Sequence, residues 1–241
     1  MNDNNLNSAI VLFSGGQDST TCLAWALEKF DHVETIAFNY NQRHSIELTC
    51  RLNVLNAIRE KFQSWDKKLG QDHLIDIPFL SDISDTSLTS ESEIFYRENG
   101  LPSTFVPGRN LFFLTLTGAI AYRRGIKNIV TGVCETDFSG YPDCRNETIL
   151  SQQKTLSLGL DFPMEIHTPL MWIDKAKTWN MSFEIGGKEL VEIICRDTHT
   201  CYLGDRSQKF DWGYGCCKCP ACEIRKRGWE QFLQIGEYVL S

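Results

Sequence analysis

The sequence contains no long apolar run and no excess of basic residues. No stretch approaches the ~20 consecutive apolar residues of a membrane-spanning helix, so we expect no contact with a membrane. The chain starts with a polar segment, and the apolar run that follows, Ala9–Phe13, is too short for a secretory signal. Lys and Arg number 24 against 31 Asp and Glu, a formal net charge of -7, which argues against broad binding to nucleic acid. These absences predict a cytoplasmic protein.

The chain is long enough to be stable without disulfides. A protein of 241 residues can bury ~70–75% of the surface of its unfolded chain. Five of its ten cysteines are scattered singly: Cys22, Cys50, Cys134, Cys144 and Cys195. The other five crowd near the end of the chain: Cys201, Cys216, Cys217, Cys219 and Cys222. Single reduced cysteines are usually small core residues, whereas a crowded group indicates a metal site.

Apolar, strand-like runs alternate with helical stretches along the chain. The runs predicted as strands cover residues 9–13, 33–40, 73–79, 128–133 and 164–170. Helices are predicted over residues 21–30, 46–62 and 110–124. This alternation predicts an α/β fold, with a Rossmann-like parallel sheet of about five strands and helices on both faces. Ligands of such sheets bind outside the carboxyl ends of the strands.

One segment, residues 80–108, interrupts this alternation. It is rich in Ser, Thr, Asp and Glu and has few apolar positions. A connection of this length in a compact domain is usually a functional loop or a disordered segment. We expect a lid or a loop on the substrate side, and a plain surface insertion is the alternative.

The first predicted strand leads into the sequence "LFSGGQDSTTC", residues 12–22. It has neither a Walker lysine nor a GxGxxG pattern, but Ser14, Gly15 and Gly16 form a tight turn in which side chains would block a close ligand. The helix after the turn presents free backbone N–H groups and the positive end of its dipole, so the turn is suited to phosphate. The carboxylate of Asp18 would repel phosphate unless a cation lies between them, and Mg²⁺ is the cation we expect. The alternative is a tight turn in which Asp18 or Ser19 caps the helix.

This turn resembles the SGGxDS pyrophosphate loop of the PP-loop ATP pyrophosphatases. The resemblance implies the adenine nucleotide alpha-hydrolase-like fold. It also implies that the loop holds the β- and γ-phosphates of ATP while a substrate oxygen attacks the α-phosphate. Arg109 and Lys175 are candidates to neutralise phosphate charge, although each alone is more often a surface cation. The expected ATP-binding residues are Phe13, Ser14, Gly15, Gly16, Gln17, Asp18, Ser19, Thr20, Thr21, Cys22 and Leu23.

The crowded cysteines follow the spacing of a metal site. Cys216, Cys219 and Cys222 stand as C-x2-C-x2-C, and Cys201 precedes them. Four thiolates suit one tetrahedral, structural Zn²⁺ per subunit, with no open position for catalysis. An iron–sulfur cluster is the alternative. We leave Cys217 out of the ligand set, because it would give a less usual C-x-C spacing to Cys219.

Longer stretches resemble one family within the PP-loop enzymes. They are "FNYNQRH" at residues 38–44, "TFVPGRN" at 104–110, "VTGVCETDFSGYPDCR" at 130–145, "TPLMWIDKAKTW" at 168–179 and "TCY…CCKCPACEIR" at the end. Together they are similar to the 7-cyano-7-deazaguanine synthases of queuosine biosynthesis. The resemblance implies a homodimer that converts 7-carboxy-7-deazaguanine, ammonia and ATP to a nitrile. Two positions depart from it, since Asn41 and Cys217 stand where we expect glycine.

The loop after the fourth predicted strand supplies the candidate substrate residues. Its acids can accept hydrogen bonds from the amino group and ring N–H of a guanine-like base, and its aromatic side chain can stack on the base. The alternative is a polar loop tied by its own hydrogen bonds. The candidates are Glu135, Asp137, Tyr141, Asp143 and Arg145.

Three other functions are weighed against this one. A PP-loop enzyme that modifies tRNA, a thiolase or a lysidine-type ligase, would be expected to have a basic surface. A glutamine-hydrolysing amidotransferase would need a further domain, and a non-enzymatic zinc module would not need the phosphate loop. We expect a nucleotide-binding α/β domain over residues 1–190 and a zinc-binding region over residues 191–241 packed on it.

Overall fold

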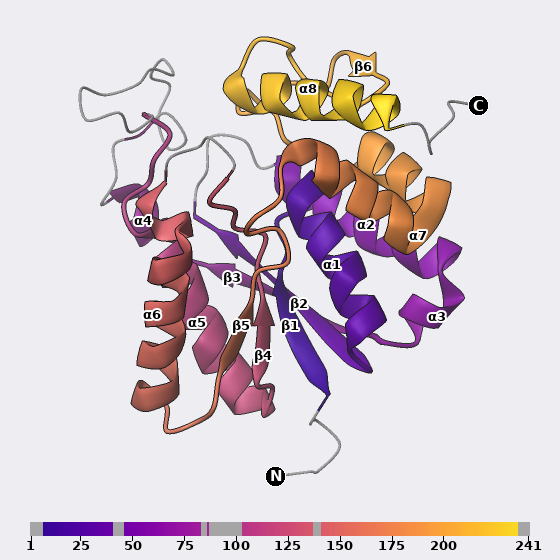
Figure 1. Cartoon of the computed structure of the whole chain (residues 1–241). Coiled ribbons are helices and arrows are strands. Elements are labelled where there is room, and N and C mark those ends of the chain that lie inside the picture. The colour runs from indigo at the N-terminus through magenta and orange to yellow at the C-terminus, as the bar shows by residue number, and fades with distance from the viewer. Residues whose placement is uncertain (1–6, 41–45, 83–85, 87–102, 137–140, 236–241) are drawn as a thin grey trace.

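The computed structural model describes residues 7–40, 46–82, 86, 103–136 and 141–235. Five parallel strands form one sheet in the order β3-β2-β1-β4-β5 (Figure 1). The strands are β1 (Ser8–Leu12), β2 (His32–Asn39), β3 (Leu69–Asp76), β4 (Asn128–Val130) and β5 (Glu165–His167). The predicted α/β fold with a five-stranded parallel sheet is therefore confirmed.

Strand β1 lies at the centre of the sheet because both of its faces are apolar. Ala9 and Val11 are fully buried in the core on one face, and Ile10 is fully buried in the core on the other. A strand buried on both faces reads as a continuous apolar run, as "AIVL" does here. The turn that follows β1 therefore begins at a fixed point in the middle of the sheet.

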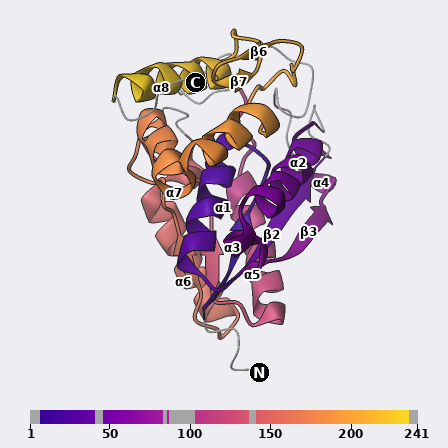
Figure 2. The same ribbon diagram turned by 90° about the vertical axis from the view of Figure 1, so that its right-hand side faces the viewer.

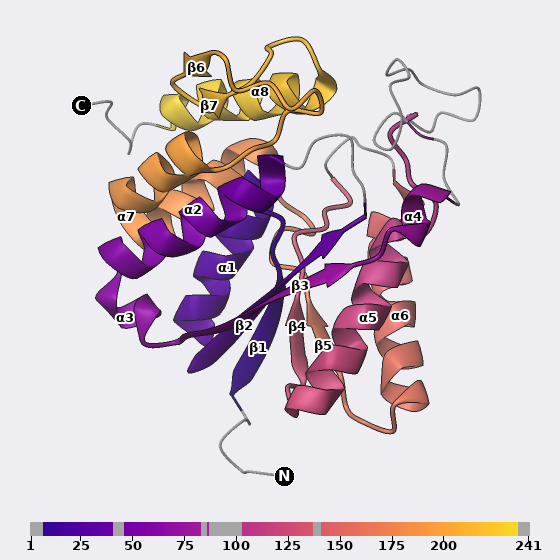
Figure 3. The ribbon, with the colours of Figure 1, turned by 180° about the vertical axis from the view of Figure 1, so that it is seen from behind.

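Helices cover both faces of the sheet, as the alternation predicts (Figures 1 and 3). On one face lie α1 (Gln17–Lys29), α2 (Ile46–Lys61), the short α3 (Gln63–Asp66) and α7 (Lys175–Asp197). On the other face lie α5 (Arg109–Arg124) and α6 (Asn146–Gly159). The one-turn helix α4 (Phe79–Asp82) follows β3, and a 3-10 turn at Pro142–Cys144 leads into α6.

The end of the chain forms a small layer above the carboxyl ends of the strands (Figure 2). It consists of the hairpin of β6 (Lys209–Phe210) and β7 (Gly213–Tyr214), followed by α8 (Pro220–Gln234). Helix α8 packs on α7 through aromatic rings, with Trp179 4.8 Å from Trp229 between ring centroids. The predicted division at residue 190 falls within α7, and one apolar core joins the two sides of it.

Several predicted boundaries are wrong by a few residues. Strand β3 begins at Leu69, before the apolar run predicted to start at His73, because its first half has only one buried apolar residue, Leu69, and so gives no apolar run. Strands β4 and β5 are shorter than predicted. Most of the predicted lid, residues 80–108, lies outside the described residues, so its role stays a prediction. Among the described helices, none has both the length and the hydropathy needed to cross a membrane.

A fully buried arginine joins α8 to the rest of the protein. Arg225 donates hydrogen bonds to the backbone oxygens of Trp212 (2.9 Å) and Ile194 (2.9 Å), and to Oγ1 of Thr200 (2.8 Å). Its side chain is 0% exposed. Buried cations are tolerated only when every donor finds an acceptor, so this network fixes how the C-terminal layer sits on α7.

Replacing Arg225 by Met should lower the free energy of unfolding by about 2–4 kcal/mol, because three acceptors, two of them in buried hydrogen bonds, lose their donor. Urea unfolding of the purified variant measures this loss. Arg227→Met is the matched control, since Arg227 is exposed on the same helix, and it should leave stability within about 0.5 kcal/mol. Equal stabilities for the two variants would contradict the structural role of Arg225.

Candidate functional site

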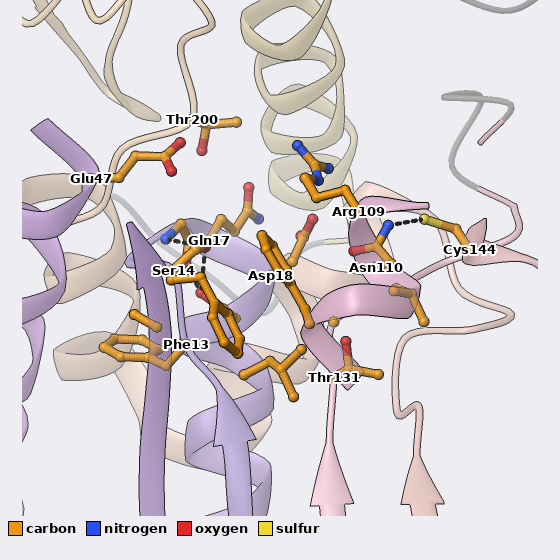
Figure 4. Close-up of a pocket in the computed structure, with 18 of the residues that line it drawn as sticks. Phe13, Ser14, Gln17, Asp18, Glu47, Arg109, Asn110, Thr131, Cys144 and Thr200 are labelled. Carbon is orange, nitrogen blue, oxygen red and sulfur yellow. Dashed lines mark hydrogen bonds between the residues drawn. The ribbon is translucent and has the colours of Figure 1, made fainter. Parts of the chain in front are cut away.

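A cavity of about 350 Å³ opens at the carboxyl ends of β1, β2 and β4 (Figure 4). Residues that follow these strands line it, among them Phe13, Tyr40 and Thr131. Side chains from α1, α2, α5 and α7 complete its walls, and the segment before α8 contributes to them too. This is where ligands of open α/β sheets bind.

The turn between β1 and α1 forms one end of the cavity. Gly15 has φ of +88°, and a Cβ there would lie 2.6 Å from the backbone nitrogen of Arg51 in α2. Only glycine satisfies both constraints without strain. The Ser14 hydroxyl lies 3.2 Å from that of Ser19, and Ser14 and Ser19 both line the cavity. The N-terminus of α1, which starts at Gln17, therefore faces a polar recess suited to an anion.

Asp18 is paired with a lysine from the other half of the chain. Nζ of Lys175, at the start of α7, lies 2.8 Å from both carboxylate oxygens of Asp18. Both side chains line the cavity, and Lys175 is 13% exposed. The positive charge of Lys175 offsets the carboxylate charge beside the turn between β1 and α1, so this part of the cavity can accept an anion.

The segment just before Cys201 packs against the turn between β1 and α1, which is formed by Ser14, Gly15 and Gly16. The backbone N–H of His199 donates to the carbonyl of Gly15 at 3.1 Å. Nε2 of His199 donates to the Cys201 carbonyl at 2.9 Å, which leaves Nδ1 as an acceptor. Burial lowers the pKa of His199, which keeps the ring neutral. His199 and Thr200 both line the cavity, so the C-terminal layer is part of the site.

The cavity is also lined by an aromatic pair and by two further charged side chains. Phe38 and Phe113 stack at 4.5 Å between ring centroids. Arg109 and Glu47 face the cavity from α5 and α2 (Figure 4). Burial raises the pKa of Glu47 to about 7, against the opposing charge of Arg109. Burial alone would lower the pKa of Arg109, but Tyr40 and other nearby groups raise it above its ordinary value.

Only part of the predicted ATP-binding segment faces the cavity. Among its lining residues are Phe13, Ser14, Gly16, Gln17, Asp18 and Ser19. Gly15 forms the turn behind them. The next four residues, Thr20, Thr21, Cys22 and Leu23, are fully buried in α1, and the Thr21 hydroxyl lies 2.8 Å from that of Ser182. Their side chains hold the helix in place and do not line the cavity.

The predicted substrate residues are mostly engaged elsewhere. The carboxylate of Glu135 accepts the backbone N–H of Asn146 at 2.9 Å, which caps α6. Asp143 likewise accepts the N–H of Asn110 at 3.0 Å and caps α5. Arg145 is exposed, and Asp137 lies outside the described residues. Of the four candidates that the structure describes, Tyr141 alone lines the cavity, where its hydroxyl pairs with that of Thr104 at 2.5 Å.

Sequence reasoning missed Glu47, His199 and Thr200 as cavity residues. Glu47 stands in the first turn of a helix, where an acid ordinarily stabilises the helix dipole, so its type gave no signal. The position of Glu47 in the chain did give a signal, because α2 starts just after the carboxyl end of β2, where ligands of such sheets bind. His199 and Thr200 are close in sequence to Cys201, and the predicted metal site was not expected to adjoin the cavity.

The four predicted metal ligands come together. The Sγ atoms of Cys201, Cys216, Cys219 and Cys222 all lie within 4.8 Å of one another. Two of the pairs are 3.9 and 4.0 Å apart. Four thiolates on one tetrahedral Zn²⁺ at about 2.3 Å lie about 3.8 Å apart, so the donor set fits a single ion. In a [4Fe–4S] cluster each thiolate binds a different iron, and in a [2Fe–2S] cluster two thiolates bind each iron, so either cluster needs wider spacing across the set.

Cys217 stays outside this cluster, as expected. Its φ is +56°, the left-handed region that favours glycine. This conformation explains why glycine is expected at this position, and Cys217 adopts it while the four ligand cysteines still converge. Asn41, the other departure, lies outside the described residues.

A family model described as "Queuosine biosynthesis protein QueC" matches residues 8–233. The chain belongs to the QueC family. It is 57% identical to a 7-cyano-7-deazaguanine synthase of Bordetella parapertussis, over 98% of this chain and 96% of that protein. It is 60% identical to a 7-cyano-7-deazaguanine synthase of a Polaromonas species, over 93% of this chain and 96% of that protein. The family that the sequence motifs predict is therefore confirmed.

The fold is shared more widely than the family. A solved 4-thiouridine synthetase, in complex with RNA and ATP, superposes with a TM-score of 0.52 at 16% identity. The match covers 95% of this chain and 51% of that chain, so this chain spans about half its length. At this identity the likeness concerns the fold alone, and it carries no argument for an RNA substrate.

Replacing Cys219 by Ser should remove most of the bound metal and lower the melting temperature, because a structural metal site loses a ligand. Elemental analysis of the purified protein and a thermal melt measure both effects. Cys217→Ser is the control, because Cys217 lies outside the four-thiolate set, and it should keep one metal ion per chain. Equal metal loss in both variants would contradict this ligand assignment.

Glu47 should make the ligand-free protein less stable as pH rises. Its folded pKa is raised to about 7. Between pH ~4.5 and ~7 the unfolded chain has therefore released this proton while the folded protein still holds it, and stability falls. Relative to wild type, Glu47→Gln should gain stability across that window, by on the order of 2 kcal/mol at pH 8.

Urea unfolding of both proteins at pH 5 and pH 8 measures this gain. Glu60→Gln, an exposed change on the same helix, should show the wild-type pH dependence. The pKa assignment would be wrong if wild type and Glu47→Gln kept parallel pH profiles.

Proposed function

We propose that this protein converts 7-carboxy-7-deazaguanine and ammonia to 7-cyano-7-deazaguanine at the cavity, and that ATP drives the reaction. Membership of the QueC family and identity near 60% to 7-cyano-7-deazaguanine synthases support the reaction. The observation that supports its location is that one cavity is lined both by the glycine turn at the start of α1 and by the stacked rings of Phe38 and Phe113. A nucleotide and a flat heterocycle can therefore lie side by side.

The phosphate end accounts for activation of the carboxylate. A carboxylate is a poor electrophile, and joining its oxygen to the α-phosphorus of ATP turns that oxygen into a leaving group. In this step the bond between the α-phosphorus and pyrophosphate breaks. The free N–H groups at the start of α1 hold the departing pyrophosphate, and Lys175 and Arg109 offset the charge that develops.

The same site can serve the second half of the reaction. Ammonia attacks the activated carbon, AMP leaves, and a proton is lost to give an amide. The amide oxygen then attacks the α-phosphorus of a second ATP, which releases pyrophosphate, and loss of AMP and two protons from the adenylated amide yields the nitrile. Both activations need the substrate oxygen against the α-phosphorus, so one phosphate turn suffices for the two.

We further propose that Mg²⁺ accompanies ATP and that the four-cysteine site holds a structural Zn²⁺. The spacing of the thiolates supports a single tetrahedral ion. With four protein ligands it has no open position and takes no part in the chemistry. The homodimer and the cytoplasmic location implied earlier remain predictions.

The direct test incubates the protein with 7-carboxy-7-deazaguanine, ATP, Mg²⁺ and ammonium, and follows the products by mass spectrometry and nucleotide chromatography. We expect the nitrile together with AMP and pyrophosphate. AMP without the nitrile would move the activity to another carboxylate or to RNA. A nitrile formed with ADP would refute attack at the α-phosphorus.

Lys175→Gln should lower kcat/KM for ATP by about 100-fold, because Asp18 then stands unpaired beside the phosphates. Steady-state kinetics at fixed substrate measure this loss. Lys177→Gln is the matched control on the same helix, since the Lys177 side chain is exposed and away from the cavity lining. Equal kinetics for both variants would place the phosphate site elsewhere.

A further inference from the structure

The cavity contains buried polar groups that the protein leaves without partners. The side chain of Gln17 is 2% exposed, and neither its amide nitrogen nor its amide oxygen has a hydrogen-bond partner among the described residues. The same holds for Nε of Arg109. Leaving such groups unsatisfied is costly, so they indicate a polar ligand that both donates and accepts hydrogen bonds.

Glu47 presents a carboxylate to the same space. Its side chain comes from the first turn of α2 and points into the cavity, on the side away from Arg109 (Figure 4). Within the described part of the chain, Glu47 forms no ion pair with Arg109. A carboxylate accepts only, so the ligand group that meets it must carry N–H or O–H donors.

The positive charge of Arg109 limits which ligand donors can lie beside Glu47. A guanidinium that faces the same cavity repels a cation, so neutral N–H groups fit beside Glu47 better than an ammonium ion does. The wall formed by Phe38 and Phe113 is suited to a flat ring. A flat, neutral ring with adjacent N–H donors along one edge matches all three observations.

We propose that Glu47 reads the guanine-like edge of the substrate, accepting hydrogen bonds from its ring N–H and its exocyclic amino group. This rests on the proposed function, because it takes the 7-deazaguanine ring as the ligand. Arg109 then lies beside the substrate carboxylate, which must approach the α-phosphate. Glu47 takes over the role that sequence reasoning gave to Glu135, whose carboxylate instead caps α6.

The test compares 7-carboxy-7-deazaguanine with its analogue that lacks the exocyclic amino group. Wild-type protein should prefer the complete substrate by about 100-fold or more in kcat/KM, because a site built to pair with an amino group rejects a ligand without one. In Glu47→Gln the preference should fall below about 10-fold, with most of the loss on the complete substrate. A neutral amide pairs less well with two adjacent donors.

Two further variants separate recognition from folding. Glu47→Asp keeps the carboxylate and should restore part of the preference, and Glu60→Gln on the same helix should match wild type. Binding of a non-hydrolysable ATP analogue, measured by calorimetry, should stay within about threefold of wild type in Glu47→Gln, because the phosphate end is unchanged. Weak analogue binding in this variant would show a disturbed cavity and overturn the assignment.

The remaining outcomes are also distinguishable. Undiminished preference in Glu47→Gln would overturn the inference and leave the proposed function standing. A raised KM for ammonium with the preference intact would also overturn it and assign Glu47 to ammonia. If the wild-type protein forms no nitrile with either compound, the proposed function is contradicted, and the inference about Glu47 is contradicted with it.

Discussion

Gly15 lies where the turn after β1 passes closest to the rest of the protein. A Cβ at this position would fall 2.6 Å from the backbone of Arg51, and the Gly15 carbonyl accepts the backbone N–H of His199. The phosphate turn is thus held between α2 and the segment that leads to the cysteine cluster. These two contacts fix the orientation of the turn. A fixed direction of the N–H groups is what the proposed binding of a departing pyrophosphate requires. The segment that leads to the four-cysteine site is therefore in direct contact with the turn that lines the cavity.

The charged side chains of the cavity differ in how they are paired. Asp18, at the N-terminus of α1, is paired with Lys175, so no uncompensated carboxylate lies beside the turn between β1 and α1. Glu47 and Arg109 face the cavity from α2 and α5 without forming an ion pair with each other. Charged groups held apart in a half-buried cavity are costly in the free protein. A ligand that satisfies them gains affinity and specificity from that cost.

What the sequence predicted well depends on local pattern. The central strand, the tight turn at Gly15 and the convergence of four cysteines each follow from short spacings, and the structure shows all three. The substrate residues could not be predicted in the same way. An acid in a loop after a strand can face a ligand or cap the next helix, and Glu135 and Asp143 cap helices. Glu47 looks like an ordinary first-turn acid until α2 and α5 are placed on opposite sides of the sheet.

The central claim is that a substrate oxygen attacks the α-phosphorus of ATP at this turn. The most direct measurement supplies 7-carboxy-7-deazaguanine labelled with oxygen-18 at both carboxylate positions and analyses the nucleotide and phosphate products by mass spectrometry. The account predicts that the label leaves the substrate in AMP and is absent from pyrophosphate. Label in inorganic phosphate, with ADP as the nucleotide product, would contradict it.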